Sequence, residues 1–569
     1  MAFPENWLPR SVTSLRHYTP RRFMQDLASG VTVGLVALPL AMAFGIASGV
    51  SPQAGLYTAV VAGFLISALG GSRVQIGGPT GAFVVIVAGI VARFGIAGLS
   101  LVTLMAGVLL VIMGLTGLGS AVKFIPRPVI IGFTNGIALL IASTQIRDFL
   151  GLRTGPVPSG FLPRMRVLAM HLGTLNGSAV AMACLTLAII LLWPRINRRV
   201  PGSILAVLLC TVAALLLHLH IETIGTRFGG IPRGFPPLTL PHLHADQILP
   251  LLPSAFTVAM LGAIESLLSA VVADGMAGDR HNSNVELVAQ GIANIAAPLF
   301  GGIPATGAIA RTATNIRSGA RTPVSGIVHA CTLLAVLLVA APLARFIPLA
   351  SLASVLFVVA WNMGEWREIG GVFRLSKADI AVWAVTFLLT VIADLTVAVA
   401  VGMGLAALLY IWRIAETTSV EPVTPQYLRE GQAHILQDKN IPAGVAILRI
   451  HGPFLFGATQ KLEEATQDLR ALPPIVILRL RNMTALDATG LHALAVFAGR
   501  LRVTGRTLLL CGARHQPAAL LARTEFIEEI GHGNILPHVQ AALDRARQLG
   551  AGSLAVEPHT ESEVELAGV

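Results

Sequence analysis

Long apolar runs recur along the first 420 positions of this 569-residue sequence, and they restrict its fold more than any other feature. A helix that crosses a bilayer needs about 20 mainly apolar residues. The runs divide evenly between two halves of the chain: 27–48, 53–69, 79–92, 98–120, 128–146, 173–193, 203–222, and then 251–273, 285–300, 304–316, 323–343, 348–361, 378–393, 395–414. Three of them, 79–92, 285–300 and 304–316, are short for a full crossing. The pattern predicts an α-helical polytopic membrane protein with fourteen transmembrane segments.

The low charge density agrees with a membrane location. Only 12% of the residues are charged and 54% are hydrophobic, whereas a soluble domain carries about 25% charged residues. A soluble enzyme, a secreted disulfide scaffold and a disordered chain are therefore excluded. The four cysteines form no CxxC pair, so neither a metal site nor a disulfide framework is indicated.

The net charge of +11 is concentrated in the apolar part of the chain, where residues 1–420 hold 26 Lys and Arg against 14 Asp and Glu. These basic residues fall in short gaps between apolar runs, as the positive-inside rule requires of cytoplasmic loops. They therefore do not indicate a nucleic-acid partner. The gap with Arg147, Arg153, Arg164 and Arg166 falls on the opposite side and is an exception. We predict a plasma-membrane protein with both termini in the cytoplasm and a basic arm at 1–26.

The character of the sequence changes after Arg413. Short β-type runs at 445–450, 475–480 and 507–510 alternate with helical patterns at 461–472 and 490–501. We predict a transmembrane domain at 27–420, made of repeats 27–223 and 251–414. A small cytoplasmic α/β domain follows at 430–548. The acidic end, 549–569, is expected to be a disordered tail.

Two short glycine-rich and proline-containing segments occupy matching positions in the two halves. Gly77–Ala82 reads GGPTGA and Gly301–Ala308 reads GGIPATGA, with Pro79 and Pro304 225 positions apart. Two seven-span halves in one membrane have opposite orientations, and interrupted helices at matching positions of inverted repeats mark transporter sites. With proline at the start of each short helix, the free N–H groups would hold an anion. The alternative is that these small residues only allow close helix packing.

Charged side chains inside the apolar runs are few. Glu265 lies in the middle of the eighth run, where an acid costs about 2.5–3.5 kcal/mol, so a role in proton uptake or cation binding is indicated. Its alternative is a structural acid bonded to Ser266 or Ser269. Arg311 follows the second glycine-rich segment and would add positive potential to an anion site, or would snorkel to the membrane surface. The other acids of this part lie at span ends, where water is available: Asp26, Asp274, Asp279, Glu286, Asp379 and Asp394.

The sequence contains no catalytic constellation and no Walker motif, so we expect no enzyme activity and no ATP hydrolysis. His242, His244 and Asp246 form a short cluster in a proline-rich stretch, which is weak evidence for metal. We therefore predict neither a metal nor a cofactor.

With these motifs in view, the sequence resembles the SulP family of anion permeases. The likeness rests on five stretches: Val33–Pro52, 55–59, Gly70–Ala82, Glu265–Asn294 and Gly301–Ile316. The C-terminal domain resembles a STAS domain through the loop Leu486–Gly490. The stretch from Glu265 and the sequence WNMGEW at 361–366 look similar to the bacterial C4-dicarboxylate branch.

This resemblance implies a core domain that moves against a gate domain, in a homodimer in the bacterial inner membrane. It also implies anion binding between the third and tenth helices. The implied binding residues are Phe44, Thr80, Gly81, Ala82, Phe83, Thr306, Gly307, Ala308 and Arg311. From the position of Glu265 inside a span, we predict that Glu265 and Ser269 take part in ion or proton coupling.

In STAS domains related to anti-sigma antagonists, the hydroxyl residue before the loop glycine can be phosphorylated. Thr489 occupies that position, and its alternative role is to cap the following helix. The STAS domain could also bind a cytosolic partner.

These observations predict a secondary transporter of small anions that works by alternating access. The substrate stays open among sulfate, bicarbonate and C4 dicarboxylates. Glu265 favours protons as the coupling ion over sodium, because a sodium-coupled relative would often carry Asp there. Two other classes remain: an anion channel or voltage-driven motor, and a scaffold that acts through its STAS domain.

Overall fold

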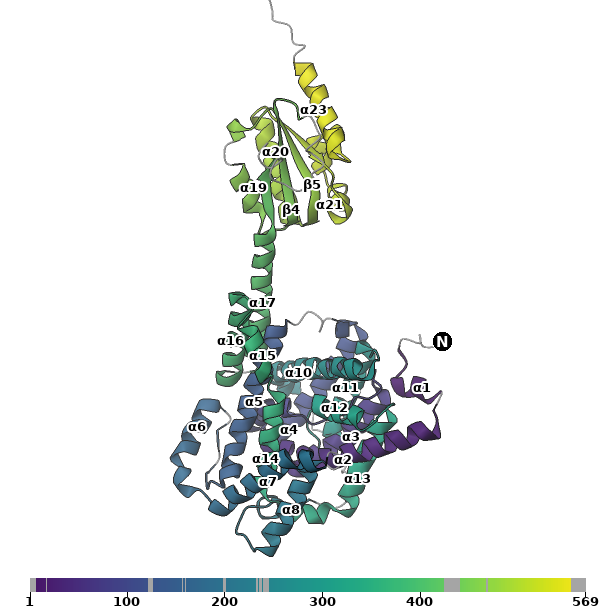
Figure 1. Cartoon of the computed structure of the whole chain (residues 1–569), viewed down its shortest axis with the longest axis vertical. Coiled ribbons are helices and arrows are strands. Elements are labelled where there is room, and N and C mark those ends of the chain that lie inside the picture. The colour runs from purple at the N-terminus through teal and green to yellow at the C-terminus, as the bar shows by residue number, and fades with distance from the viewer. Residues whose placement is uncertain are drawn as a thin grey trace, which may run out of the picture. The chain divides into compact units, whose positions relative to one another are not determined.

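A computed structural model describes residues 7–553, apart from 17, 121–125, 156, 159, 198–200, 232–233, 235–237, 239–244, 394, 424–440 and 467–468. The chain divides into two compact units, 1–406 and 407–569 (Figure 1). The first unit is helical and the second is built around a five-stranded sheet.

One helical bundle of the first unit comes from the beginning of each half of the chain. Its members contact one another extensively: α2 (Pro20–Ala47), α3 (Pro52–Leu69), α4 (Gly81–Leu115), α10 (Ala245–Ala277), α11 (Ser283–Leu299), α12 (Ile309–Arg317) and α13 (Val324–Val339). The short helix α1 (Arg10–Leu15) packs on α3. We call this set the first bundle.

The remaining helices of the first unit form the second bundle. Its members are α5 (Arg127–Leu150), α6 (Phe161–Met170), α7 (Gly177–Ile196), α8 (Gly202–Leu216), α14 (Leu349–Met363), α15 (Trp366–Val372) and α16 (Lys377–Ile392). Connecting pieces are the 3₁₀ helices η3 (Leu172–Thr174) and η4 (Ala341–Phe346) and the short helix α9 (Ile224–Phe228). The long helix α17 (Leu395–Thr417) runs from the first unit into the second.

Each of the fourteen predicted apolar runs contains a helix, which confirms the polytopic helical fold. Within the described residues, eight helices are long and apolar enough to span a membrane, and α8 and α13 are shorter apolar helices. The runs 79–92 and 98–120 are joined as the single helix α4, which breaks at Gly95, where φ is +68°. The nine residues of α12 rise about 14 Å, so this helix covers only half of a bilayer.

The two glycine-rich segments meet inside the first bundle. Strand β1 (Gly77–Gly78) pairs antiparallel with β2 (Thr306–Gly307), with Gly77 opposite Gly307 and Gly78 opposite Thr306. Each strand leads into a helix, β1 into α4 and β2 into α12. This two-stranded pairing satisfies backbone groups of broken helices inside a membrane domain, where water is scarce.

The second unit contains the expected alternation of strands and helices. Its sheet has the order β3 (Ser419–Pro422), β4 (Val445–Phe454), β5 (Ile475–Leu486), β6 (Thr507–Cys511), β7 (Ile535–Leu536). The pair β3–β4 is antiparallel and the other pairs are parallel. The helices α19 (Thr459–Ala465), α20 (Ala488–Val503), α21 (His515–Leu521) and α22 (Phe526–Ile530) contribute to the core on one face, and α23 (Val539–Ser553) covers the other (Figure 1).

Strand β5 is buried on both faces, and helix α23 extends past residue 548. Along β5, Val476 and Leu478 point into one core and Ile475 and Ile477 into the other, as a strand buried on both faces requires. Helix α23 reaches Ser553, which lies within the stretch predicted as a tail. Residues 554–569 of that tail, and the predicted start of the domain at 430, lie outside the described residues.

Candidate functional site

The candidate site lies where the paired strands end and the two broken helices begin. The N-cap residues are Thr80 for α4 and Ala308 for α12. Proline is therefore not the first helical residue, as the repeat had suggested: Pro79 precedes the cap of α4, and Pro304 lies before strand β2. The reason is that residues 306 and 307 are used in the strand pairing, which delays the start of α12.

Glu265 points to the start of α4. Its carboxylate accepts a hydrogen bond of 2.9 Å from the hydroxyl of Thr80, and both side chains are buried. A negative charge is stabilised at a helix N-terminus by the free N–H groups and the helix dipole. The alternative partners are engaged elsewhere: Ser266 donates to the carbonyl of Ala263 over 3.1 Å, and the Ser269 hydroxyl lies 3.2 Å from that of Thr312.

Arg311 reaches across from α12 to the first glycine-rich segment. Its side chain is 3% exposed, and Nη2 donates to the carbonyl oxygen of Pro79. Within the described residues, Nη1 is buried without a hydrogen-bond partner. The arginine therefore does not snorkel to the surface. Its guanidinium keeps a free donor beside the starts of two helices, which suits a carboxylate-like or sulfate-like oxyanion.

The other predicted residues divide into those that meet the site and those that pack behind it. The Phe44 ring touches the start of α4, because a methyl group at Gly81 would lie 3.4 Å from Phe44 Cε1. Thr306 is held by a 2.9 Å hydrogen bond to the Gly262 carbonyl. Phe83 and Ala82 are part of the apolar core. The N–H of Ala308 is bonded to the carbonyl of Ile76 over 2.8 Å, so it is not available to an anion.

Three polar residues that the motifs did not reveal hold the two broken segments in place. Gln75 donates to the carbonyl of Ser266 over 2.9 Å. Asn294 bonds both backbone groups of Ala305 over 2.8 Å, and Thr58 accepts the N–H of Ile303 over 2.7 Å. The only signal in the sequence is that polar residues interrupt apolar runs, which does not identify their partners.

Two of the acids expected in water are buried instead. Asp26 and Glu286 are both 0% exposed. Asp26 accepts bonds from the N–H groups of Arg321 and Thr322 over 2.7 and 3.1 Å, and Glu286 accepts from those of Gly71 and Ser72 over 2.9 and 3.2 Å. They tie helix ends to turns, and backbone donors replace the water that was expected. Asp394 lies outside the described residues.

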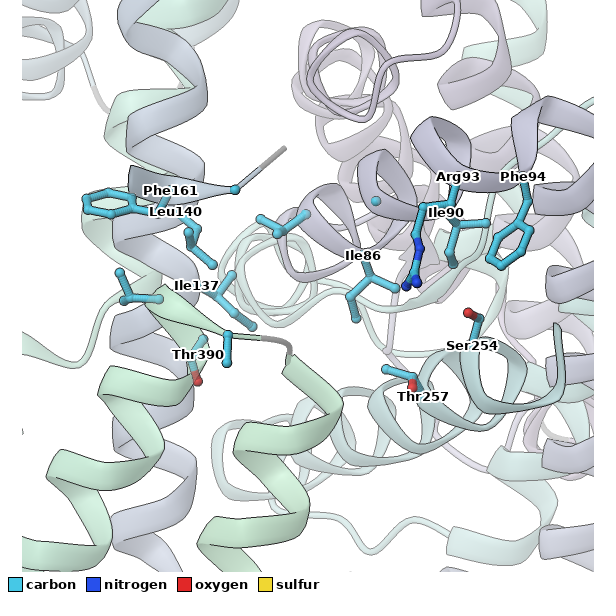
Figure 2. Close-up of a pocket in the computed structure, with 15 residues that line it drawn as sticks. Ile86, Ile90, Arg93, Phe94, Ile137, Leu140, Phe161, Ser254, Thr257 and Thr390 are labelled. Carbon is cyan, nitrogen blue, oxygen red and sulfur yellow. The ribbon is translucent and has the colours of Figure 1, made fainter. Parts of the chain in front are cut away.

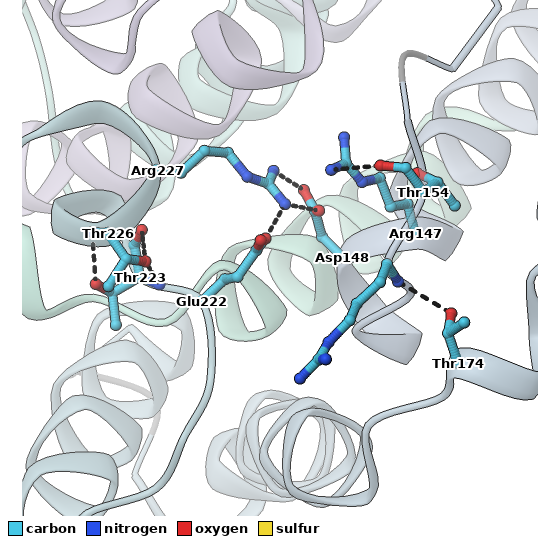
Figure 3. A network of polar contacts seen from close by, with 9 residues as sticks. Arg147, Asp148, Thr154, Thr174, Glu222, Thr223, Thr226 and Arg227 are labelled. Atoms are coloured by element: carbon cyan, nitrogen blue, oxygen red, sulfur yellow. Dashed lines mark hydrogen bonds and ion pairs between the residues drawn. The ribbon is translucent and has the colours of Figure 1, made fainter.

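A polar network near the C-terminal end of α5 accounts for part of the exception to the positive-inside rule. Arg227 binds Asp148 with two hydrogen bonds, over 2.8 and 3.1 Å, and also contacts Glu222 (Figure 3). Nearby, Arg147 lies within 3.5 Å of the Thr154 carbonyl (Figure 3). Arg164 is 5% exposed and bonds the Ser143 hydroxyl over 2.8 Å. These basic residues are occupied within the fold, and so they are weak topology signals.

Thr489 lies one residue past the start of α20, and its side chain is exposed. The cap of this helix is Asp487, whose carboxylate accepts the N–H of Gly490 over 2.7 Å and that of Phe456 over 3.1 Å. The capping role considered for Thr489 is therefore filled by Asp487.

Among the described residues, no group of three His, Cys, Asp or Glu side chains could hold a metal ion. His242 and His244 of the weak cluster lie outside the described residues.

Comparison with known proteins gives matches along both units. The model of the sulfate permease family matches residues 23–386, and that of the STAS domain matches 437–542. The chain is 45% identical over 523 residues to the provisionally named sulfate transporter YvdB of Bacillus subtilis (strain 168), covering 92% of this chain and 97% of that one. It is 31% identical over 575 residues to the bicarbonate transporter BicA of a Picosynechococcus strain, covering 96% and 97%.

The fold is shared with a solved structure, that of the murine anion transporter solute carrier 26 family member A9 in the inward-facing state. The TM-score is 0.84 at 18% identity, and the match covers 95% of this chain and 94% of that chain. The expected likeness to the C4-dicarboxylate branch finds no support in these relatives, which are named for sulfate and bicarbonate.

Proposed function

Because this chain belongs to the sulfate permease family of anion transporters, we propose that it is a secondary active transporter of sulfate or bicarbonate coupled to protons. The anion would bind between the starts of α4 and α12, and it would cross by alternating movement of the first bundle against the second. The observation that carries this proposal is the β1–β2 pairing, which starts both broken helices beside Glu265 and Arg311.

The chemistry of this site supports an anion. Two helix N-termini and the free Nη1 of Arg311 supply donors and positive potential. Binding residues would be Phe44, Thr80, Gly81, Thr306 and Gly307 together with Arg311, whereas Ala82, Phe83 and Ala308 would shape the site from behind. The single acid, Glu265, would repel the anion when ionised and would not when protonated. Binding of a proton and of the anion would then favour each other, which is what symport requires.

Coupling to sodium is the second candidate. Glu265 and Ser269 lie one turn apart on α10, and their partners Thr80 and Thr312 supply two further hydroxyl oxygens from other segments. In this case external sodium, and not an inward proton gradient, would drive uptake.

The test is uptake of radiolabelled anions into proteoliposomes, with sulfate, bicarbonate and a C4 dicarboxylate in the panel and with pH and sodium varied independently. We expect the proton gradient to accelerate uptake by the wild type, and Glu265→Gln to lose that acceleration. Glu368→Gln is a matched control, because this acid forms an exposed ion pair with Arg127. Glu265→Gln uptake that still follows the proton gradient would contradict proton coupling.

The same preparation separates the transporter from a channel or voltage-driven motor. A carrier gives saturable uptake, whereas a channel would give large currents with weak temperature dependence.

We further propose that both termini are cytoplasmic and that the protein is a homodimer in the plasma membrane. Reagents that cannot cross the membrane, and cross-linking in native membranes, test these two points.

A further inference from the structure

A cavity of about 220 Å³ lies between the two bundles, apart from the site described above. Its walls come from α4 and α10 of the first bundle and from α5, α16 and the start of α6 of the second (Figure 2). On α10 its lining residues Ser254 and Thr257 precede Glu265 by 11 and 8 positions, or about 16 and 12 Å along the helix. The cavity is therefore beside the site, toward the N-terminal end of α10.

Arg93 is the one charged residue among those that line this cavity. Figure 2 shows its side chain extending from α4 into the cavity, toward the α10 segment with Ser254 and Thr257. Its guanidinium lies 5.9 Å from the ring of Phe94, and within the described residues it has neither an ion pair nor a hydrogen bond. The lining includes no Asp or Glu, so nothing in the wall neutralises this charge.

A row of residues on α4 links the cavity to the proposed anion site. Gly81, Val85, Gly89 and Arg93 follow one another at a spacing of four residues, and such a row turns about 40° around the helix at each step. Gly89 leaves room in the middle of this row, because a methyl group there would meet no atom within 4 Å. The row thus runs obliquely from the positive end of α4 to Arg93.

We propose that this cavity is a recruitment site for small oxyanions, at which Arg93 binds the anion before it moves along α4 to the central site. The proposal rests on the proposed function and adds a second anion subsite to it. With the N-terminus in the cytoplasm, the cavity faces the outside of the cell. A single unpaired cation in a partly enclosed pocket raises the local concentration of anions without binding them tightly, so the anion can move on.

The first measurement uses anion uptake by proteoliposomes. Arg93→Gln is expected to raise KM about three- to tenfold with little change in the maximal rate, and Arg93→Lys to restore most of the affinity. The KM of the wild type should also rise more steeply with ionic strength than that of Arg93→Gln. Arg166→Gln, which removes an exposed arginine of α6 outside the cavity, is the matched control. An unchanged KM in Arg93→Gln would overturn the proposal.

The second measurement does not depend on transport and so separates this proposal from the proposed function. Gly89→Cys is made in a background in which the exposed Cys184 and Cys331 are replaced by serine. A sulfonate-bearing thiol reagent should modify the new thiol about three to ten times faster, relative to a cationic reagent of similar size, than it does when Arg93→Gln is also present. Sulfate should slow the modification only when Arg93 is retained. Equal charge preference with and without Arg93 would refute the recruitment site, even in a protein that transports anions normally.

Discussion

Single residues at the start of α20 differ in what they contribute to the C-terminal domain. Asp487 satisfies two backbone N–H groups, of Gly490 and Phe456, whereas Thr489 is exposed and its hydroxyl has no hydrogen bond within the described residues. An N-cap acid contributes about 1 kcal/mol to helix stability. A hydroxyl that faces water contributes little, which leaves it accessible to a kinase.

We predict that Asp487→Ala and Thr489→Ala have different effects on the rates of amide hydrogen exchange in the full-length protein. Loss of about 1 kcal/mol should speed exchange of the Gly490 and Phe456 amides roughly fivefold in Asp487→Ala. Thr489→Ala should leave both rates unchanged, since no bond is lost. Equal effects of the two substitutions would mean that Thr489 shares the capping role. Phosphopeptide analysis of protein from native cells then tests the proposed modification of Thr489.

At the same scale, the sequence identifies rare charges but not their partners. Glu265 and Arg311 are conspicuous because charged side chains inside a membrane are costly. The hydroxyl of Thr80 and the carbonyl of Pro79 that they contact are 185 and 232 positions away. Burial of Asp26 and Glu286 was missed for the same reason, because the N–H groups that satisfy them belong to other segments.

At the level of elements, glycine sets how closely the helices of the first bundle approach. A methyl group at Gly55 of α3 would lie 1.9 Å from the Ala41 carbonyl oxygen of α2. Gly107 of α4 and Gly291 of α11 face each other in the same way, with a methyl group at either one 2.6–2.7 Å from the opposing carbonyl. The proposed anion site does not exclude close packing by small residues. A methyl group at Gly77 of strand β1 would lie 2.3 Å from Ile66 Cδ1, so the glycines of the paired strands also allow close packing.

We predict that Gly55→Ala destabilises the detergent-solubilised protein by about 1–3 kcal/mol, the usual cost of overpacking, because the clash is with backbone that has no room to move. Gly275→Ala is the control, since a methyl group at that position of α10 would meet nothing within 4 Å. It should be neutral or slightly stabilising. The measurement is the midpoint of thermal unfolding, followed by size-exclusion chromatography. A midpoint for Gly55→Ala equal to that of the wild type would mean that α2 and α3 are not held this closely.

The positions of helices and strands could be predicted from the sequence better than the places where they begin and connect. Hydrophobic runs located the helices, and alternation located β4, β5 and β6, because both signals are local. The merging of two runs into α4 depends on the backbone break at Gly95. The delayed start of α12 depends on the pairing of Gly77 with Gly307 and of Gly78 with Thr306, residues 230 and 228 positions apart. Proline positions alone could not show that pairing.

On the scale of the whole molecule, each unit has its own apolar cores. The two large cores of the helical unit, which include Phe83 and Phe44, draw no fully buried residue from beyond 406. The cores of the second unit lie on the two faces of its sheet and include Phe454 and Leu543. The proposed anion site and the cavity at Arg93 are both built from residues of the first unit.

A truncation after Thr417, where α17 ends, tests which unit carries the function. We predict that the shortened chain keeps the substrate KM of the full-length protein, because every residue proposed to bind the anion remains. Its maximal rate falls if the C-terminal domain regulates or stabilises the transporter. The measurement is uptake in proteoliposomes at matched protein amounts, with Glu265→Gln in the same shortened chain as the control.

If the main role were that of a scaffold, the truncation would abolish the cellular function, and the purified protein would show no uptake or only uptake without substrate specificity. Saturable uptake that depends on Glu265 would instead assign transport to the helical unit and leave regulation to the STAS domain.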